Sequence, residues 1–141
     1  MEESAALWED AQPSHEPATP IDCSESIYTV PSAMGSGYQR EIQLQPGVEL
    51  CIFNRTYRDL TLHLPESPHP VQFMVHLAGI IDSGDFLYQD SDWGYIGGSG
   101  IQRPVDSFFP RSQRNVGIDI HLQPEVLAQF LGHLLGNYRP S

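Results

Sequence analysis

Basic residues are scarce in this chain of 141 residues, which has 7 Lys plus Arg against 18 Asp plus Glu. The formal net charge of -11 repels a phosphate backbone, so this segment alone is not expected to bind DNA. Long apolar runs are also missing, because no window approaches the roughly 18 to 20 consecutive apolar residues of a membrane-spanning helix. The N-terminus has no basic region followed by an apolar one. These absences predict a soluble, cytoplasmic protein that does not contact a membrane.

Reactive motifs are similarly few. Cys23 and Cys51 are the two cysteines, and because they lie far apart in different kinds of sequence, a disulfide between them is not expected. The stretch 97–100, Gly-Gly-Ser-Gly, lacks the Gly-x-Ser-x-Gly pattern of a serine nucleophile and the lysine of a phosphate-binding loop. The sequence therefore predicts no catalytic residue and no enzyme activity.

Alternation of apolar and polar residues is the dominant pattern that is present. It runs through residues 37–53 and is interrupted by Pro46-Gly47, which supplies turn chemistry, so this segment predicts a β-hairpin. The apolar positions of the hairpin are Ile42, Leu44, Val48, Leu50 and Ile52. Similar alternation predicts strands at 58–64, 71–77 and 116–122. In the segment 71–77 one face carries Val71, Phe73, Val75 and Leu77, the other carries Gln72, Met74 and His76, and the pattern leaves open which face is interior.

The remaining segments are predicted from turn and helix signals. Residues 82–100 indicate turns that join short strands, and residues 103–114 indicate a loop or an edge strand because they contain Pro104 and Pro110. A helix is predicted from Pro124, followed by Glu125 near its positive end and stopped by Gly136-Asn137. Its wide apolar stripe comprises Val126, Leu127, Phe130, Leu131, Leu134 and Leu135. One small domain cannot bury all of these, so the helix either lies across the domain or contacts a second copy.

Length and composition predict one domain with three parts. Residues 1–26 are expected to form a flexible arm, because they are acidic and contain three prolines without a sustained period. Ala5, Leu7 and Trp8 offer a short apolar anchor within that arm. Residues 27–123 are expected to form the β-domain and residues 124–137 the helix.

Three segments also carry a family resemblance: Gly37–Leu50 (GYQREIQLQPGVEL), Phe73–Gly79 (FMVHLAG) and Gly117–Leu127 (GIDIHLQPEVL). Their residue order resembles the sensor domain of AraC-type transcription regulators, in the siderophore-responsive, pyochelin regulator-like branch, over roughly Gly35 to Phe130. The resemblance implies a mainly β fold, a small cupin-like β-barrel (jelly roll) with a ligand pocket, followed by a C-terminal amphipathic helix that dimerises. Family members bind DNA through two further helix-turn-helix motifs, which these 141 residues do not contain. The chain is therefore expected to be an excised sensor domain or a stand-alone version of one.

A small-molecule ligand, with a ferric siderophore as the candidate, and a homodimer are the partners that this resemblance implies. The residues expected near the mouth of the barrel are Tyr38, Arg40, Tyr88, Trp93 and Tyr95, with His63 and His76 deeper inside. An arginine can pair with a carboxylate-bearing ligand, although Arg40 can equally pair with a carboxylate of the protein, and each aromatic residue can simply pack in the core. The residues expected to dimerise are Leu127, Phe130, Leu131 and Leu134.

Two other functions stay open. Metal-dependent cupin enzymes hold their metal with a His-x-His pair, which this chain lacks, and of its separate histidines only His63 and His76 could meet across neighbouring strands. A stand-alone cupin enzyme with a metal on His63, His76 and a carboxylate is the second hypothesis, and no metal or cofactor is predicted under the first. An interaction domain without a ligand is the third.

Overall fold

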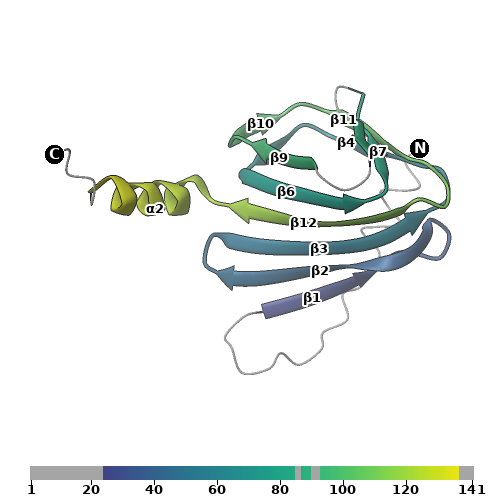
Figure 1. Ribbon diagram of the computed structural model, residues 1–141, viewed down its shortest axis with the longest axis horizontal. Coiled ribbons are helices and arrows are strands. Elements are labelled where there is room, and N and C mark those ends of the chain that lie inside the picture. Colours follow the sequence, from purple (N-terminus) through teal and green to yellow (C-terminus); the bar gives the residue numbers. More distant parts are fainter. Residues whose placement is uncertain (1–23, 85–86, 90–92, 137–141) are drawn as a thin grey trace.

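The computed structural model of the protein describes residues 24–84, 87–89 and 93–136, which are almost entirely β-structure (Figure 1). The strands are β1 (Ser24–Thr29), β2 (Gly35–Gln45), β3 (Val48–Tyr57), β4 (Leu60–Leu64), β5 (Ser67–His69), β6 (Val71–Ala78), β7 (Ile80–Asp82), β8 (Leu87–Gln89), β9 (Trp93–Gly97), β10 (Gly100–Gln102), β11 (Val105–Phe109) and β12 (Arg114–Leu122). The helix is α2 (Pro124–Gly136). The arm expected at residues 1–26 lies outside the described residues up to position 23, and β1 begins at Ser24.

The long strands form one antiparallel sheet in the order β1-β2-β3-β12-β6-β9. The predicted hairpin is confirmed as β2 and β3, and Gly47 takes a φ of 79° in the turn between them, a conformation that costs glycine little. The predicted strands at 58–64, 71–77 and 116–122 correspond to β4, β6 and β12. The alternation in the sequence therefore locates these strands.

The shorter strands form a four-stranded sheet, β4-β11-β7-β8, and a two-stranded one, β10-β5. Hydrogen-bonded ladders among the described residues leave these three sheets separate, not closed into a barrel. The mainly β prediction is thus confirmed, whereas the cupin-like jelly roll stays a prediction.

The strand β11 corrects one expectation. Residues 103–114 were expected to form a loop or an edge strand, but β11 pairs with β4 on one side and with β7 on the other. Pro104 and Pro110 lie immediately outside its two ends, so neither proline removes a donor from the ladder.

The hydrophobic core lies where the long sheet faces the four-stranded sheet. Its members are Val30, Met34, Tyr57, Leu60, Ile81 and Phe109, each at most 9% exposed. The rings of Tyr57 in β3 and Phe109 in β11 meet edge to face with their centroids 4.9 Å apart. This contact fixes which face of β3, and hence of the whole long sheet, is turned toward the shorter strands.

The helix α2 follows β12 after a single residue, Gln123. The backbone N–H of Gln123 donates to the backbone carbonyl of Gly47 at 2.8 Å. The start of the helix at Pro124 is as predicted. In Figure 1 the helix extends beyond the end of the sheets and does not lie across them. Within the described residues, no helix is long and apolar enough to cross a membrane.

Candidate functional site

The long sheet has two unlike faces. Residues directly opposite each other in antiparallel strands share a face, so the face that holds Tyr57 can be followed through the register. This inner face consists of Gln39, Glu41, Glu49, Cys51, Phe53, Arg55, Tyr57, Gln72, Met74, His76, Asn115, Gly117, Asp119 and His121. The question that the sequence left open is thereby settled: Gln72, Met74 and His76 are interior.

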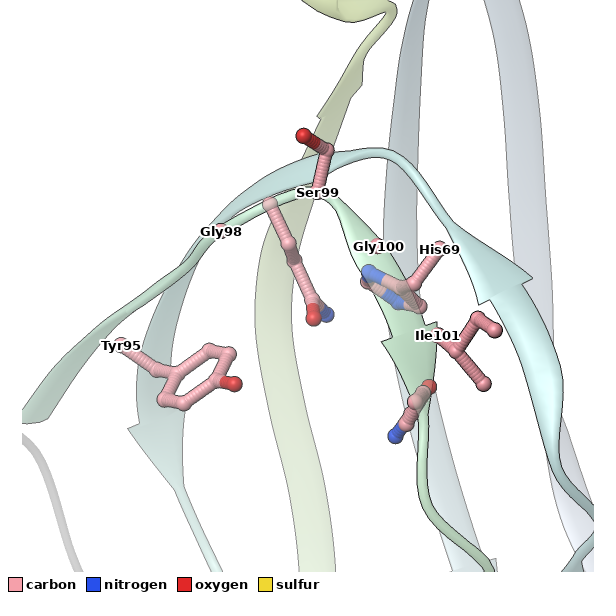
Figure 2. A pocket seen from close by; sticks show the side chains of 8 residues that line it. His69, Tyr95, Gly98, Ser99, Gly100 and Ile101 are labelled. Carbon is pink, nitrogen blue, oxygen red and sulfur yellow. The ribbon is translucent and has the colours of Figure 1, made fainter.

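A pocket lies at the end of the inner face nearest α2, between β5, β6, β9 and β10. It has a volume of about 240 Å³ and is lined by His69, Gln72, Tyr95, Gly98, Ser99, Gly100, Ile101 and Gln102. Figure 2 shows the rings of Tyr95 and His69 pointing toward one another from opposite sides of this pocket. The amide side chains of Gln72 and Gln102 add groups that both donate and accept hydrogen bonds.

Polar contacts connect this pocket with β12. Gln72 Nε2 donates to Asp119 Oδ2 at 2.5 Å, and the His69 ring meets the His121 ring edge to face at 5.4 Å between centroids. His121 lies between two carboxylates, with Nδ1 3.6 Å from Glu49 Oε1 and Nε2 3.6 Å from Asp119 Oδ2. A second hollow of about 270 Å³, lined in part by Glu49 and His121, adjoins this group. The two histidines therefore stand between two hollows.

The electrostatics of this group centre on Asp119, whose side chain is 14% exposed. Burial raises the pKa of its carboxyl above the ordinary value, and His121, the Gln72 hydrogen bond, His69 and Arg55 oppose that rise. Asp119 Oδ1 and His121 Nε2 are buried and have no hydrogen-bond partner within the described part of the chain. Buried polar atoms are costly without a hydrogen bond, and His121 lines the second hollow, so this group is suited to meet a ligand there with Asp119 behind it.

Arg55 also lies on the inner face of the long sheet, and it is absent from the residues that the sequence analysis places in the binding site. Its Nη1 donates to Gln39 Oε1 at 2.8 Å, and its guanidinium carbon lies 4.6 Å from the centroid of the Phe53 ring. Beside it, burial raises the pKa of the Cys51 thiol to about 12, with Arg55 opposing the rise. The sequence indicates this position, because Arg55 lies two residues from each of the apolar residues Phe53 and Tyr57, and alternate residues of a strand share a face.

Two of the residues expected to bind a ligand lie on the inner face of the long sheet, His76 on β6 and Tyr95 on β9. His76 is fully buried, at 0% exposure, and Tyr95 lines the pocket. Trp93 pairs with His76 in the register of β9 and β6, and Tyr88 pairs with Ile81 between β8 and β7. The side chains of Trp93 and Tyr88 lie outside the described residues.

The other expected residues lie elsewhere. Tyr38 and Arg40 are on the opposite, outer face of the long sheet, where Arg40 Nε donates to Glu25 Oε1 at 2.5 Å. His63 is 62% exposed in β4, and its Nδ1 lies 2.5 Å from Asp106 Oδ1. The expected meeting of His63 with His76 is wrong, because β4 pairs with β11 and not with β6.

The residues expected to dimerise lie along α2. Leu127 is half-buried beside the long sheet, whereas Phe130 and Leu131 are 61% and 46% exposed. The side chain of Leu134 is outside the described residues. Most of the apolar surface of the described helix is therefore open to a partner.

In the described ranges, no group of three or more His, Cys, Asp or Glu side chains is arranged to hold a metal ion. The sequence matches no protein-family model, and no curated protein shows significant similarity to it. Function therefore has to be argued from the site and from the resemblance in the sequence.

Proposed function

We propose that the chain is the ligand-sensing and dimerisation domain of an AraC-type transcription regulator and that it binds a small molecule at the polar end of its inner face. The resemblance of Gly37–Leu50, Phe73–Gly79 and Gly117–Leu127 to that family supports the regulator part. The observation that carries the ligand part is the buried polar group around Asp119: its hydrogen-bond partner Gln72 lines the first hollow, and its neighbour His121 lines the second. A sheet interior that needed only to fold would be better filled with apolar side chains.

The chemistry of the group restricts the ligand. Carboxylates and amides predominate in it, and Arg55 is the one Lys or Arg on the inner face within the described residues. Such a lining favours a ligand that is neutral or cationic and carries N–H or O–H donors. A ferric siderophore remains the candidate from the resemblance, and an uncharged or cationic iron complex suits the lining better than an anionic one.

Size adds a further condition. The pocket of about 240 Å³ is smaller than the roughly 300 to 1,000 Å³ of sites for drug-sized ligands. A ligand as large as an iron–siderophore complex therefore needs both hollows. It reaches both if the His69 and His121 rings separate, which makes these two side chains the expected gate between them.

The connection from ligand to helix is short. Asp119 and His121 belong to β12, which runs through Gln123 directly into α2, and the Gln123 amide is held by the Gly47 carbonyl. A ligand that binds one arrangement of β12 better than another shifts the arrangement of the helix by the same free-energy difference. In a regulator, that shift changes how an attached DNA-binding domain is presented.

A thermal-unfolding titration tests this proposal. The panel contains anionic, neutral and cationic ferric siderophores, the same molecules without iron, and divalent metal ions alone. A ligand at about 100 times its Kd raises the free energy of unfolding by about 2.7 kcal/mol. We expect a neutral or cationic complex to stabilise the protein, Asp119→Asn to weaken that response at least about tenfold in Kd, and Asp106→Asn to leave it unchanged, because Asp106 is 67% exposed and lines neither hollow.

The contrary results are distinct. Stabilisation by a bare metal ion alone would favour the cupin enzyme hypothesis. No response to any compound would remove the ligand part of the proposal and favour an interaction domain. An equal response in Asp119→Asn and in the wild type would place the binding site elsewhere.

A further inference from the structure

The outer face of the long sheet is largely apolar on β3, β12, β6 and β9 and beside Ile42 of β2. It carries Ile42, Val48, Leu50, Ile52, Phe73, Val75, Ile96, Val116, Ile118, Ile120 and Leu122. Val75 is 49% exposed and Ile96 is 73% exposed, and the other members are half-buried among their neighbours. Large contiguous apolar surfaces of this kind mark interaction sites in soluble proteins.

The charges of the chain avoid this surface. Among the described residues of the outer face only Glu25, Arg40 and Arg114 are charged, and the first two form an ion pair with each other. Arg114 Nε donates to Asn54 Oδ1 at 2.9 Å near one end of the sheet. A chain with a formal net charge of -11 thus keeps one large face free of unpaired carboxylates.

This surface continues onto α2. An apolar groove of about 510 Å³ separates the sheet from the helix, with Val48, Phe73 and Leu122 on one side and Val126, Leu127 and Phe130 on the other. Phe130 and Leu131 extend the apolar surface beyond the groove. Sheet and helix therefore present one uninterrupted apolar surface.

The size of the surface means that a stable dimer needs both the sheet and the helix. With strands about 4.8 Å apart, residues about 3.3 Å apart along them and every second residue on this face, the eleven apolar residues of the sheet cover roughly 350 Å². The exposed side of α2 adds to this area, toward the roughly 800 Å² per partner of a standard interface.

We propose that this outer face, continuous with α2, packs against the same face of a second copy of the chain. Two copies carry equal charge of one sign, and this face lets them meet without opposing carboxylates. A two-fold arrangement places identical faces against each other, as sheets stack in a β-sandwich. Residues 1–23 are another candidate to cover the face, but apart from the short apolar anchor Ala5, Leu7 and Trp8 they are polar, with six carboxylates and no Lys or Arg, so they suit a large apolar surface less well than a second copy does.

The inference deepens the dimerisation part of the proposed function, yet it is separable from ligand binding because the ligand group lies on the opposite face. The test is sedimentation equilibrium of the full chain at about 10 to 100 µM, a range that captures moderate affinities. The variants are Val75→Glu with Ile96→Glu on the sheet, Phe130→Glu on the helix, and Phe108→Glu as the control. Phe108 is 41% exposed on the outer side of the four-stranded sheet.

We expect a wild-type dimer, a shift to monomer of at least about 100-fold in Kd for the sheet variant, and no shift for the control. All the changed side chains are already exposed, and the far-UV circular dichroism and thermal unfolding of each variant verify its fold. A monomeric wild type would overturn the proposal. So would a sheet variant that remains dimeric while Phe130→Glu becomes monomeric, since the helix alone would then form the interface. The ligand titration of the sheet variant separates this failure from that of the proposed function.

Discussion

The two faces of the long sheet consist of alternate residues of the same strands. In the half nearest α2 the usual distribution of polarity is inverted, because the inner face is polar and the outer face is apolar. Near α2 the inner face holds Asp119, His121 and Gln72, whereas the outer face opposite carries Ile118, Ile120 and Phe73. At the other end Tyr57 and its neighbours form an ordinary apolar core. The difference separates two roles: one end of the interior holds the fold together, and the other end is available for binding.

The largest effect is expected when one apolar residue on each face is truncated to alanine and the losses in the free energy of unfolding are compared. Tyr57 is 2% exposed, and Tyr57→Ala is expected to reduce the free energy of unfolding by about 3 to 5 kcal/mol. Ile96→Ala, at a position 73% exposed, is expected to change it by less than about 0.5 kcal/mol in the monomer. Urea denaturation at low protein concentration measures both. Equal losses would mean that the outer face is already covered within one chain.

A medium effect is expected at the polar end of the inner face. Because burial raises the pKa of Asp119 in the folded state, the folded protein holds that proton to higher pH than the unfolded chain does. The free energy of unfolding is therefore highest below the pKa that Asp119 has in the unfolded chain. It falls as the pH rises through the higher pKa that Asp119 has in the folded protein. Asp119→Asn removes this loss, so it is expected to stabilise the protein by about 1 kcal/mol at pH 7, and by less as the pH is lowered toward 4.

Denaturation curves at the two pH values measure that effect, with Asp106→Asn as the matched control. A variant that is more stable but binds ligand more weakly would show that Asp119 is retained for binding at the expense of stability. Destabilisation at pH 7 would contradict the reading, since the carboxylate would then be stabilising the fold through its hydrogen bond with Gln72.

The smallest effect is expected outside both faces. The His63 and Asp106 side chains are 62% and 67% exposed, and exposed pairs contribute little to stability. His63→Gln should change the free energy of unfolding by less than about 0.5 kcal/mol and leave the ligand response intact. A smaller stabilisation by ligand in the same titration would indicate that His63 belongs to the binding site.

Local patterns predicted the strands β2, β3, β4, β6 and β12 and the helix. The Pro46-Gly47 turn, the alternation at 71–77 and Pro124 all act over a few residues, so the sequence alone locates them. The choice of interior face could not be predicted from the period of two, because both faces satisfy it equally. That choice depends on which side the shorter strands cover, and the covered side near α2 is the polar one.

The candidate site was predictable only in part for the same reason. Arg40 looked suitable as the first charged residue of a strand, but the pairing of β1 with β2 brings Glu25 beside it, 15 positions earlier in the chain. Asp119 and His121 were read as parts of a strand, because nothing in the local sequence shows that β12 lies between β3 and β6. Long-range strand order decides both cases.

Because the thiol of Cys51 is buried, a new cysteine on the outer face of the long sheet can be labelled without labelling Cys51. Burial raises the pKa of the Cys51 thiol to about 12, so little of it is ionised near neutral pH, and the thiolate is the form that reacts with maleimides and nitroxide reagents. In a Cys23→Ser background, a cysteine placed at Ile96 would therefore react selectively. Spin labels at that position would report the separation of two copies directly, with and without a ligand bound on the other side of the sheet.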